Sequence, residues 1–293
     1  MKSGFVSVVG RPSSGKSTLI NALCGYKVSI VSHVPQTTRN RIRGILSLAQ
    51  GQIVLVDTPG YHQSQKRLNQ QLNELVHTSL GESDAILYVV DSTRTIGEEE
   101  NQTIALIKES QLPVVVVVNK IDLCEDSGQR IAQIFSEVFP QAKLFKTDAL
   151  HWRGSSAIMD VAHALLSLLP EGDFLYPTEY VTDQTPLFRI SEIIREKAIN
   201  RLDKEVPHSL YVEIADLEQQ ENQMWIRAFI IVERNSQIGI VVGNRGEKID
   251  QIRRLAKREI KHHFPDYAIT LDLRVKANGK WRKNQHLLSQ MIH

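Results

Sequence analysis

Cysteine, aromatic residues and long apolar runs are all scarce in this chain of 293 residues, which has two cysteines and 6% aromatic residues. Cys24 and Cys124 form no CxxC motif and lack metal-ligand spacing, which argues against a zinc module and a disulfide framework. We expect both thiols to be reduced. The longest apolar stretch, residues 112–118, is far shorter than the roughly 18 residues of a membrane span, so the sequence predicts no transmembrane helix.

The N-terminal sequence leaves no room for a signal peptide. Met1 and Lys2 lead directly into a strand pattern that ends at Gly10, and we therefore expect a cytoplasmic protein. A charged fraction of 23% and a hydrophobic fraction of 42% are ordinary for globular proteins, which argues against a disordered or fibrous chain. The length predicts two domains.

The small net charge of +2 hides an uneven distribution of charged residues. Residues 1–170 have 16 basic and 15 acidic side chains, residues 171–233 have 6 and 13, and residues 234–293 have 13 and 5. The three segments therefore differ strongly in sign. An excess of basic residues at the C-terminal end predicts a surface that binds a polyanion.

Short apolar segments rich in valine and isoleucine alternate with amphipathic ones over residues 1–170. This alternation predicts an α/β domain with a mostly parallel sheet and helices on both faces. The predicted strands are residues 5–9, 44–48, 53–57, 85–91, 114–119 and 143–146, and the predicted helices are residues 17–23, 68–80, 98–110, 128–138 and 155–168. The two strands within 44–57 predict an antiparallel hairpin at one edge of the sheet.

Prolines and a glycine interrupt this pattern and predict a linker over residues 171–186. Residues 187–293 then predict an α+β domain in which the elements follow the order helix, strand, strand, helix, helix, strand, with a further helix at the C-terminus. These elements are predicted at residues 187–202, 209–217, 224–233, 238–242, 247–264 and 268–276.

A phosphate-binding loop of the pattern GxxxxGK[ST] lies between a predicted strand and a predicted helix. It reads Gly10-Arg11-Pro12-Ser13-Ser14-Gly15-Lys16-Ser17. The glycines let several N–H groups point inward, and the helix N-terminus adds its positive end. Lys16 is predicted to reach the terminal phosphates, and the Ser17 hydroxyl is predicted to bind Mg²⁺.

Two further motifs follow in the order that a GTPase requires. Asp57-Thr58-Pro59-Gly60 ends an apolar strand, where Asp57 is predicted to hold Mg²⁺ through water and the Gly60 N–H to meet the γ-phosphate. Asn119-Lys120-Ile121-Asp122 has the NKxD spacing. The Asp122 carboxylate can accept two hydrogen bonds from guanine, and adenine offers no such donor pair. Asn119 is predicted to tie this loop to the phosphate loop, and the Lys120 stem to lie over the base. The motifs together predict binding of GTP and GDP.

With these motifs the sequence resembles the translation-factor-related GTPases. Pro35-Gln36-Thr37-Thr38-Arg39 is similar to the first switch of that group, in which the threonine before the arginine ligates Mg²⁺ only when the γ-phosphate is present. The resemblance assigns this role to Thr38, with Thr37 as the alternative. The loop would be ordered in the triphosphate state, so the protein would be a switch as well as a hydrolase. Lys16, Thr38 and Gly60 are the predicted catalytic residues.

Three positions depart from the pattern of related GTPases. Tyr61 follows Gly60 where Ras-like proteins have the glutamine that orients the attacking water, so we expect slow hydrolysis. Ser13 stands where many members of the group have the asparagine associated with potassium stimulation. The base-contacting loop that usually reads Ser-Ala is matched by Asp148-Ala149, in which the predicted contact is the Ala149 N–H.

The C-terminal segment contains a GxxG motif between two predicted helices, formed by Gly243, Asn244, Arg245 and Gly246. In this order of elements the motif resembles a type II KH domain, which clamps about four nucleotides of single-stranded RNA. Arg245 and Lys248 would contact phosphate. The following helix adds further basic residues, namely Arg253, Arg254, Lys257, Arg258 and Lys261. His262 and His263 lie on the same helix, but they lack a partner at metal-ligand spacing.

A guanine-nucleotide domain followed by a KH domain resembles the Era family of bacterial GTPases over essentially the whole chain. The resemblance implies a monomer that binds 16S ribosomal RNA and assists 30S subunit assembly and 16S rRNA maturation. It also implies peripheral association with the inner membrane. An alternative is an RNA-binding module that uses GTP structurally and hydrolyses it negligibly. A tRNA-modifying or metabolic enzyme is disfavoured, because no catalytic cysteine or second cofactor motif follows residue 170.

Overall fold

The computed structural model describes residues 1–34, 37–38, 40–60, 67–152, 156–203, 205–279 and 281. The chain divides into two compact units with a boundary between Asp183 and Gln184, and the short segment Ser32–Val34 belongs to the second unit. None of the helices in these residues has the length and apolar character that crossing a bilayer requires.

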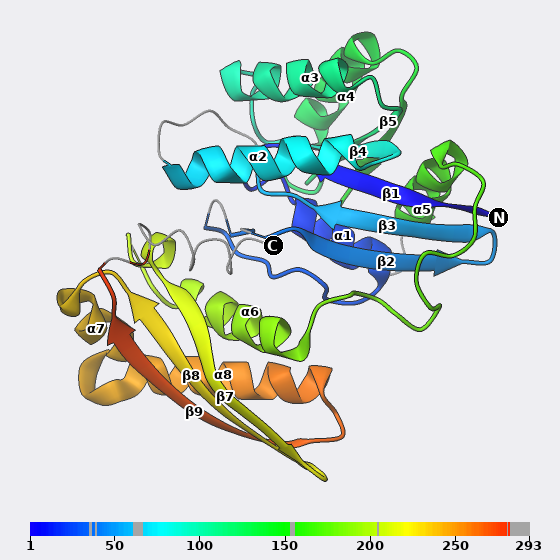
Figure 1. The fold of residues 1–293 in the computed structure, drawn as a ribbon. Helices are drawn as coiled ribbons and strands as arrows, with labels where there is room; N and C mark the ends of the chain where they lie inside the picture. The colour runs from blue at the N-terminus through cyan, green and yellow to red at the C-terminus, as the bar shows by residue number, and fades with distance from the viewer. Residues whose placement is uncertain are drawn as a thin grey trace. The chain divides into compact units, whose positions relative to one another are not determined.

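The first unit is an α/β domain, as the alternating pattern predicts (Figure 1). Its elements are β1 (Lys2–Val9), α1 (Lys16–Cys24), β2 (Ile42–Leu48), β3 (Gly51–Asp57), α2 (Arg67–Gly81), β4 (Ala85–Asp91), α3 (Glu98–Ser110), β5 (Val114–Asn119), α4 (Glu125–Val138), β6 (Lys143–Thr147) and α5 (Ser156–Leu168). The strands form one sheet in the order β2-β3-β1-β4-β5-β6. Only β2 is antiparallel to its neighbour, so the predicted hairpin lies at the sheet edge.

The sheet is buried between two layers of helices. On one face, α2, α3 and α4 pack on alternate strand residues through an apolar cluster that includes Val76, Ile107 and Phe135. The helices α1 and α5 contact each other and the opposite face. Strand β5 lies between β4 and β6 and is covered on both faces, which explains its uninterrupted run of valines. Helix α4 begins at Glu125, three residues before the predicted start.

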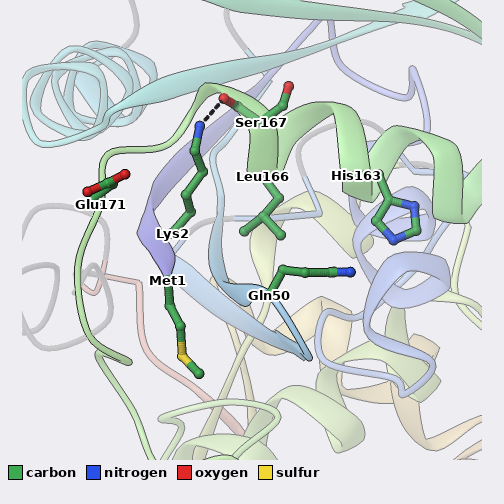
Figure 2. Close-up of a pocket in the computed structure, with 7 residues that line it drawn as sticks. All are labelled: Met1, Lys2, Gln50, His163, Leu166, Ser167 and Glu171. Carbon is green, nitrogen blue, oxygen red and sulfur yellow. Dashed lines mark hydrogen bonds between the residues drawn. The ribbon is translucent and has the colours of Figure 1, made fainter.

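The residues predicted as a linker run along the first unit. Glu171 forms an isolated bridge with Lys2, and Figure 2 shows the side chains of both residues. Thr182 forms a second bridge, with Gly44. The Gln52 side chain accepts hydrogen bonds from two backbone N–H groups of the linker and donates one to the Tyr176 carbonyl, at 2.9 Å each. The chain therefore leaves the first unit only at Asp183.

The second unit has the predicted order of elements, α6 (Pro186–Ile199), β7 (Tyr211–Gln220), β8 (Gln223–Val232), α7 (Asn235–Val242), α8 (Glu247–His263) and β9 (Ala268–Ala277). The three strands form a mixed sheet in the order β7-β8-β9, with β7 antiparallel and β9 parallel to β8. Apolar residues of the three helices and of the sheet form one core. Thr185 caps α6 by accepting a hydrogen bond from the Phe188 N–H, and Pro186 occupies its first turn.

Candidate nucleotide site and RNA-binding surface

The phosphate-binding loop joins β1 to α1, and its backbone is in positive-φ conformations at three positions. These are Gly10 (φ 156°), Ser13 (φ 64°) and Gly15 (φ 98°). A Cβ atom on Gly10 would lie 2.3 Å from the Val89 carbonyl oxygen, and one on Gly15 would lie 2.2 Å from Asn119 Nδ2. At both positions a side chain would clash with these atoms, and the positive φ angle also favours glycine.

Lys16 is buried at the start of α1, and its ammonium group lies inside the loop. The Nζ atom donates hydrogen bonds to the carbonyl oxygens of Gly10 and Arg11, at 3.0 Å each. Burial lowers the pKa of Lys16 to about 8, while the carboxylates of Asp57 and Glu100 act in the opposite direction. A cation with little water around it interacts strongly with an anionic phosphate, so this position suits a nucleotide's terminal phosphates.

Three hydroxyl and carboxylate groups from different segments meet next to Lys16. The Ser17 hydroxyl donates to Asp57 Oδ2 at 2.7 Å and lies 3.1 Å from Thr38 Oγ1. Asp57 is fully buried at the end of β3, and burial raises its pKa. Its other oxygen, Oδ1, has no hydrogen-bond partner among the described residues. A buried carboxylate with one oxygen left without a hydrogen bond, beside two hydroxyls, is an oxygen-only donor set that fits Mg²⁺.

The segment after β3 contacts the phosphate loop. Thr58 Oγ1 donates to the Val8 carbonyl at 2.7 Å, which fixes the end of the strand. A Cβ atom on Gly60 would lie 2.6 Å from both the N and the Cα atoms of Pro12, so only glycine fits there without movement of the loop. Pro59 is also buried. Tyr61, Pro35, Gln36 and Arg39 lie outside the described residues.

The carboxamide of Asn119 joins three loops of the first unit. Its Nδ2 donates to the Ser14 carbonyl at 3.1 Å, which is the link between the two loops that the motif predicts. Its Oδ1 accepts from the Ala149 N–H at 3.1 Å and from Thr147 Oγ1 at 3.3 Å. The Ala149 N–H thus has a protein partner here, and its predicted contact with the base requires this hydrogen bond to be shared or replaced.

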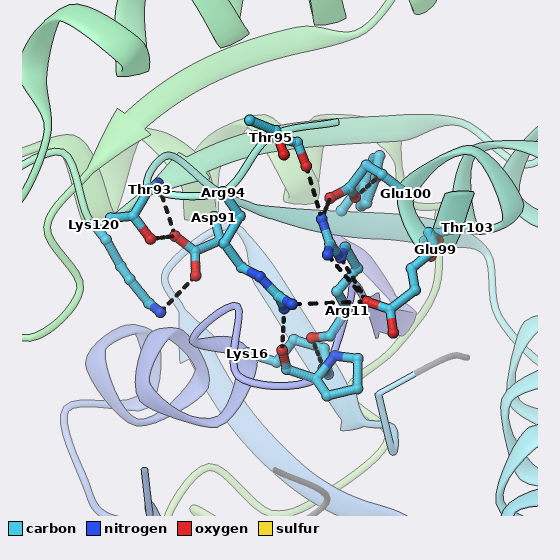
Figure 3. Close-up of polar contacts among 12 residues, drawn as sticks. Arg11, Lys16, Asp91, Thr93, Arg94, Thr95, Glu99, Glu100, Thr103 and Lys120 are labelled. Atoms are coloured by element: carbon cyan, nitrogen blue, oxygen red, sulfur yellow. Dashed lines mark hydrogen bonds and ion pairs between the residues drawn. The ribbon is translucent and has the colours of Figure 1, made fainter. Parts of the chain in front are cut away.

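Lys120 is held by polar groups of two segments, and Figure 3 shows its contact with Asp91. Its Nζ donates to the Ser13 carbonyl and to Asp91 Oδ2, at 2.7 Å each. Asp91 ends β4, is almost fully buried, and accepts two further hydrogen bonds from Thr93. Sequence reasoning missed Asp91. The available signal was its place at the end of an apolar strand, because Asp91 pairs in register with Asn119 at the same sheet edge.

Asp122 is exposed beside two residues of the loop after β6. Ligand atoms of Asp122, Asp148 and His151 lie within 4.8 Å of one another. Despite some desolvation, hydrogen bonds from His151 and from the Leu150 N–H hold the pKa of Asp148 below its ordinary value. The Ile121 N–H donates to the Thr147 carbonyl at 3.3 Å, which keeps the two loops together. Asp122 is therefore placed on a fixed loop with its carboxylate open to a ligand.

The GxxG motif of the second unit forms a short 3₁₀ turn, Asn244–Gly246, between α7 and α8. Gly243 (φ 75°), Arg245 (φ 49°) and Gly246 (φ 83°) are all in the left-handed region. A Cβ atom on Gly243 would lie 2.8 Å from Lys248 Cγ, whereas one on Gly246 would meet nothing within 4 Å. The backbone at Gly246 is therefore open to close approach by a nucleic-acid backbone.

Helix α8 presents an apolar face to the core and a basic face to the outside. Ile252, Ala256 and Ile260 are buried. Exposed basic residues lie between and directly after them, namely Arg253, Arg254, Lys257, Arg258 and Lys261. Arg253 and Arg254 form ion pairs with Asp250. The C-terminal charge excess therefore includes a solvent-facing side of the helix that follows the GxxG turn.

Comparison with known proteins matches both units. A family model described as 50S ribosome-binding GTPase matches residues 5–120, and a KH-domain model matches residues 205–282. The chain is 43% identical to GTPase Era of Treponema denticola and 42% identical to GTPase Era of Borreliella afzelii, with each alignment covering 100% of both proteins. The chain belongs to the Era family of GTPases.

Solved structures of Era have a fold similar to that of this chain. A crystal structure of an Aquifex aeolicus Era variant bound to GDP.AlF4− has a TM-score of 0.92 and 32% identity, and covers 99% of this chain and 98% of its own. A structure of Era with MgGDPNP and nucleotides 1506–1542 of 16S ribosomal RNA matches with the same values. These similarities confirm the predicted family and the predicted fold class, a P-loop GTPase domain followed by a KH domain.

Proposed function

We propose that this Mg²⁺-dependent GTPase acts as a switch that binds 16S ribosomal RNA through its KH domain and assists 30S subunit assembly and 16S rRNA maturation. The observation that carries the proposal is the convergence of Lys16, Ser17, Thr38 and Asp57 in a chain that also has an open GxxG turn. Era relatives bound to GDP.AlF4−, and to MgGDPNP with 16S ribosomal RNA, support it.

One end of the site would bind the phosphates and Mg²⁺, and the other end would bind the guanine base. The loop N–H groups and Lys16 would hold the phosphates, and Ser17, Thr38 and Asp57 would hold Mg²⁺ directly or through water. At the other end, Asp122 would accept hydrogen bonds from guanine, with the Lys120 stem over the base. The Asn119 carboxamide, bonded to Ser14 and Ala149, would keep the two ends at a fixed separation.

Hydrolysis would proceed by attack of a water oxygen on the γ-phosphorus, with cleavage of the bond to the β–γ bridging oxygen and release of GDP and phosphate. Lys16 would stabilise the negative charge that develops on the phosphates, and the Gly60 N–H would orient the γ-phosphate. Mg²⁺, when bound, neutralises charge on the β- and γ-phosphates. Since Tyr61 replaces the water-orienting glutamine of Ras-like proteins, we expect slow hydrolysis in the absence of a partner.

Thr38 and Gly60 would make the site sensitive to the γ-phosphate. The Thr38 hydroxyl contacts that of Ser17, and Gly60 lies against Pro12 of the phosphate loop. Neither Thr38 nor Gly60 belongs to a helix or strand. Contacts that need the third phosphate order such segments in the triphosphate state and release them after hydrolysis. The protein would thereby report its nucleotide state to a partner.

RNA binding would use the GxxG turn and the start of α8. Asn244 and Arg245 are exposed on the turn, and Lys248 lies half-buried at the helix start. An open backbone at Gly246 with two cations beside it suits a single-stranded sugar–phosphate backbone. The Era complex with 16S ribosomal RNA favours the small subunit as the partner over the 50S subunit that the family model names.

Phosphate release separates this proposal from the alternative. With the protein alone, we expect phosphate to be released slowly from GTP. We expect this rate to change when 30S subunits are added, or when an RNA that contains the 3′ end of 16S ribosomal RNA is added. RNA binding with negligible release under all conditions would favour a module that uses GTP structurally. Crosslinking of the intact protein to cellular RNA tests the ribosomal assignment, because fragments unrelated to the small subunit would contradict it.

The resemblance to the Era family extends the proposal to location and assembly state. We place the protein in the cytoplasm as a monomer that associates peripherally with the inner membrane. Cell fractionation in low and high salt, followed by sizing of the purified protein, tests these points. A dimer in solution, or absence from the membrane fraction at low salt, would contradict the corresponding statement.

A further inference from the structure

The side chain of Arg11, the second residue of the phosphate loop, points to helix α3 (Figure 3). Its guanidinium donates to Glu99 Oε2 at 3.0 and 3.1 Å, to the Thr95 carbonyl at 3.1 Å and to Glu100 Oε2 at 3.3 Å. Arg11 is 7% exposed, so these protein contacts take the place of hydrogen bonds to solvent. No part of the GTPase motifs accounts for this use of a buried arginine.

Glu100, one of the two carboxylate partners of Arg11, is held in turn by a residue of the sheet. Glu100 is 2% exposed, and its Oε1 accepts a hydrogen bond from the hydroxyl of Tyr88 on β4. The Tyr88 ring is fully buried and packs edge-on against Phe135 at 5.4 Å between centroids. Burial and the neighbouring carboxylate raise the pKa of Tyr88, which keeps its proton on the oxygen that donates to Glu100. The result is a chain of contacts from the phosphate loop to the sheet core.

The same loop residues carry the backbone groups that hold Lys16. The carbonyl oxygens of Gly10 and Arg11 accept from Lys16 Nζ. The next carbonyl, that of Pro12, accepts from the guanidinium of Arg94 at 3.3 Å. The residues that follow β4 therefore hold two consecutive loop residues: they accept hydrogen bonds from the Arg11 side chain, and their own Arg94 donates to the Pro12 carbonyl.

We propose that Arg11, held by Glu99 and by the Glu100 carboxylate that Tyr88 supports, is a positioning residue that fixes the main chain of the phosphate loop for binding the β-phosphate. Its side chain acts through the loop backbone and through Lys16, because the guanidinium is engaged by Thr95 and the two carboxylates of α3. Loss of the Glu100 charge would leave the guanidinium paired only with Glu99, the more exposed of its two carboxylate partners, and would weaken its hold on the loop. Binding groups must be held within a fraction of an ångström by such supporting contacts. The inference rests on the proposed nucleotide site.

Glu100→Gln is the main test, because it removes the carboxylate charge and keeps the side-chain size. We expect the Kd for GDP to rise roughly tenfold, as for loss of a charged hydrogen bond. Tyr88→Phe removes only one hydroxyl and is expected to raise the Kd in the same direction by a smaller factor. Glu109→Gln, an exposed residue near the end of the same helix, is the control and should leave the Kd unchanged.

Affinity for GMP distinguishes positioning from general stability. Each variant is titrated with fluorescent GDP, and GMP is measured by competition, at a temperature well below the unfolding midpoint. We expect the GDP Kd to change by a larger factor than the GMP Kd. Equal changes for both ligands, or a lower unfolding midpoint with an unchanged GDP Kd, would overturn the inference alone. Failure of the unmodified protein to bind GDP would overturn the proposed function as well.

Discussion

The side-chain amide of Asn119 donates a hydrogen bond to the carbonyl oxygen of Ser14 at 3.1 Å, although 105 positions separate the two residues. Asn119 ends β5 and Ser14 follows β1, so the bond spans the end of β4, which lies between those strands. The other end of the same carboxamide accepts the Ala149 N–H. The phosphate end and the base end of the proposed site are thus joined through one side chain.

Asn119→Asp should separate this link from the rest of the site. The substitution keeps an acceptor for Ala149 but replaces the donor with a carboxylate oxygen that faces the Ser14 carbonyl. We expect nucleotide affinity to fall at least tenfold, with a loss of about 1–3 kcal/mol in the free energy of unfolding. Calorimetric titration with GDP and chemical denaturation measure the two effects. Asn101→Asp, on exposed helix surface, is the control, and an equal loss there would refute the explanation.

Asp122→Asn should change the preferred base. A carboxylate accepts from both N–H donors of guanine, whereas a carboxamide can donate to the oxygen that xanthine has in place of the guanine amine. We expect GTP affinity to fall about 100-fold or more and XTP to become the better ligand. Competition binding measures the ratio. If Asp126→Asn, an exposed change on the neighbouring helix, moved the ratio equally, the assignment of Asp122 would be wrong.

Gly60→Ala should impair hydrolysis more than GDP binding. The added Cβ would lie 2.6 Å from Pro12, so the chain at Gly60 must move away from the phosphate loop. We expect a loss of about tenfold or more in the rate of phosphate release, with a GDP Kd within a few-fold of the original. Gly81→Ala is a matched control, since a Cβ there meets nothing within 4 Å. Unimpaired hydrolysis by Gly60→Ala would remove Gly60 from the proposed site.

Nucleotide affinity should fall as the pH rises above about 8. Burial lowers the pKa of Lys16 to about 8 from 10.5, and bound phosphate favours the charged ammonium. Binding then takes up a proton above that pH, which weakens affinity by at most about tenfold per pH unit. Without nucleotide, the free energy of unfolding should instead rise with pH between about 8 and 10.5. In that range the unfolded chain holds the Lys16 proton while the folded chain does not.

Lys16→Arg provides the comparison for this pH effect, because arginine stays charged over the whole range. Kd values for GDP are measured from pH 7 to 10 with both proteins. Ionisation of the guanine base affects both proteins alike, so only the difference between the two curves reports Lys16. Parallel curves would contradict the assigned titration.

Arg245→Ala should weaken RNA binding through lost phosphate contact. Arg245 is exposed on the GxxG turn, and its removal is expected to raise the Kd for single-stranded RNA about three- to tenfold while lowering the salt dependence by about one ion. Fluorescence anisotropy at several salt concentrations measures both. Arg130→Ala, on the exposed surface of α4, should change neither quantity. A salt dependence unchanged by Arg245→Ala would exclude a phosphate contact at this position.

Local patterns allowed most of the fold to be predicted. Strands such as β5 are uniformly apolar because they are covered on both faces, and α8 shows its buried face in the spacing of Ile252, Ala256 and Ile260. Element ends were predicted less accurately, since α4 begins three residues before its predicted start. The route of residues 171–183 along the first unit could not be read locally, because their partners, such as Gln52, are far away in the sequence.

The sequence by itself determined the groups that act through contiguous backbone. Gly10 to Ser17, Asn119 to Asp122 and Gly243 to Gly246 each need a particular loop conformation, and glycine and motif spacing encode that conformation within a few residues. Only the tertiary structure decided which side chains support these loops. Asp91 meets Lys120, and Glu100 meets Arg11, because strand order and register bring β4 and α3 beside the phosphate loop. Pairings over such separations leave no periodic signal in the chain, since they depend on the whole sheet being assembled.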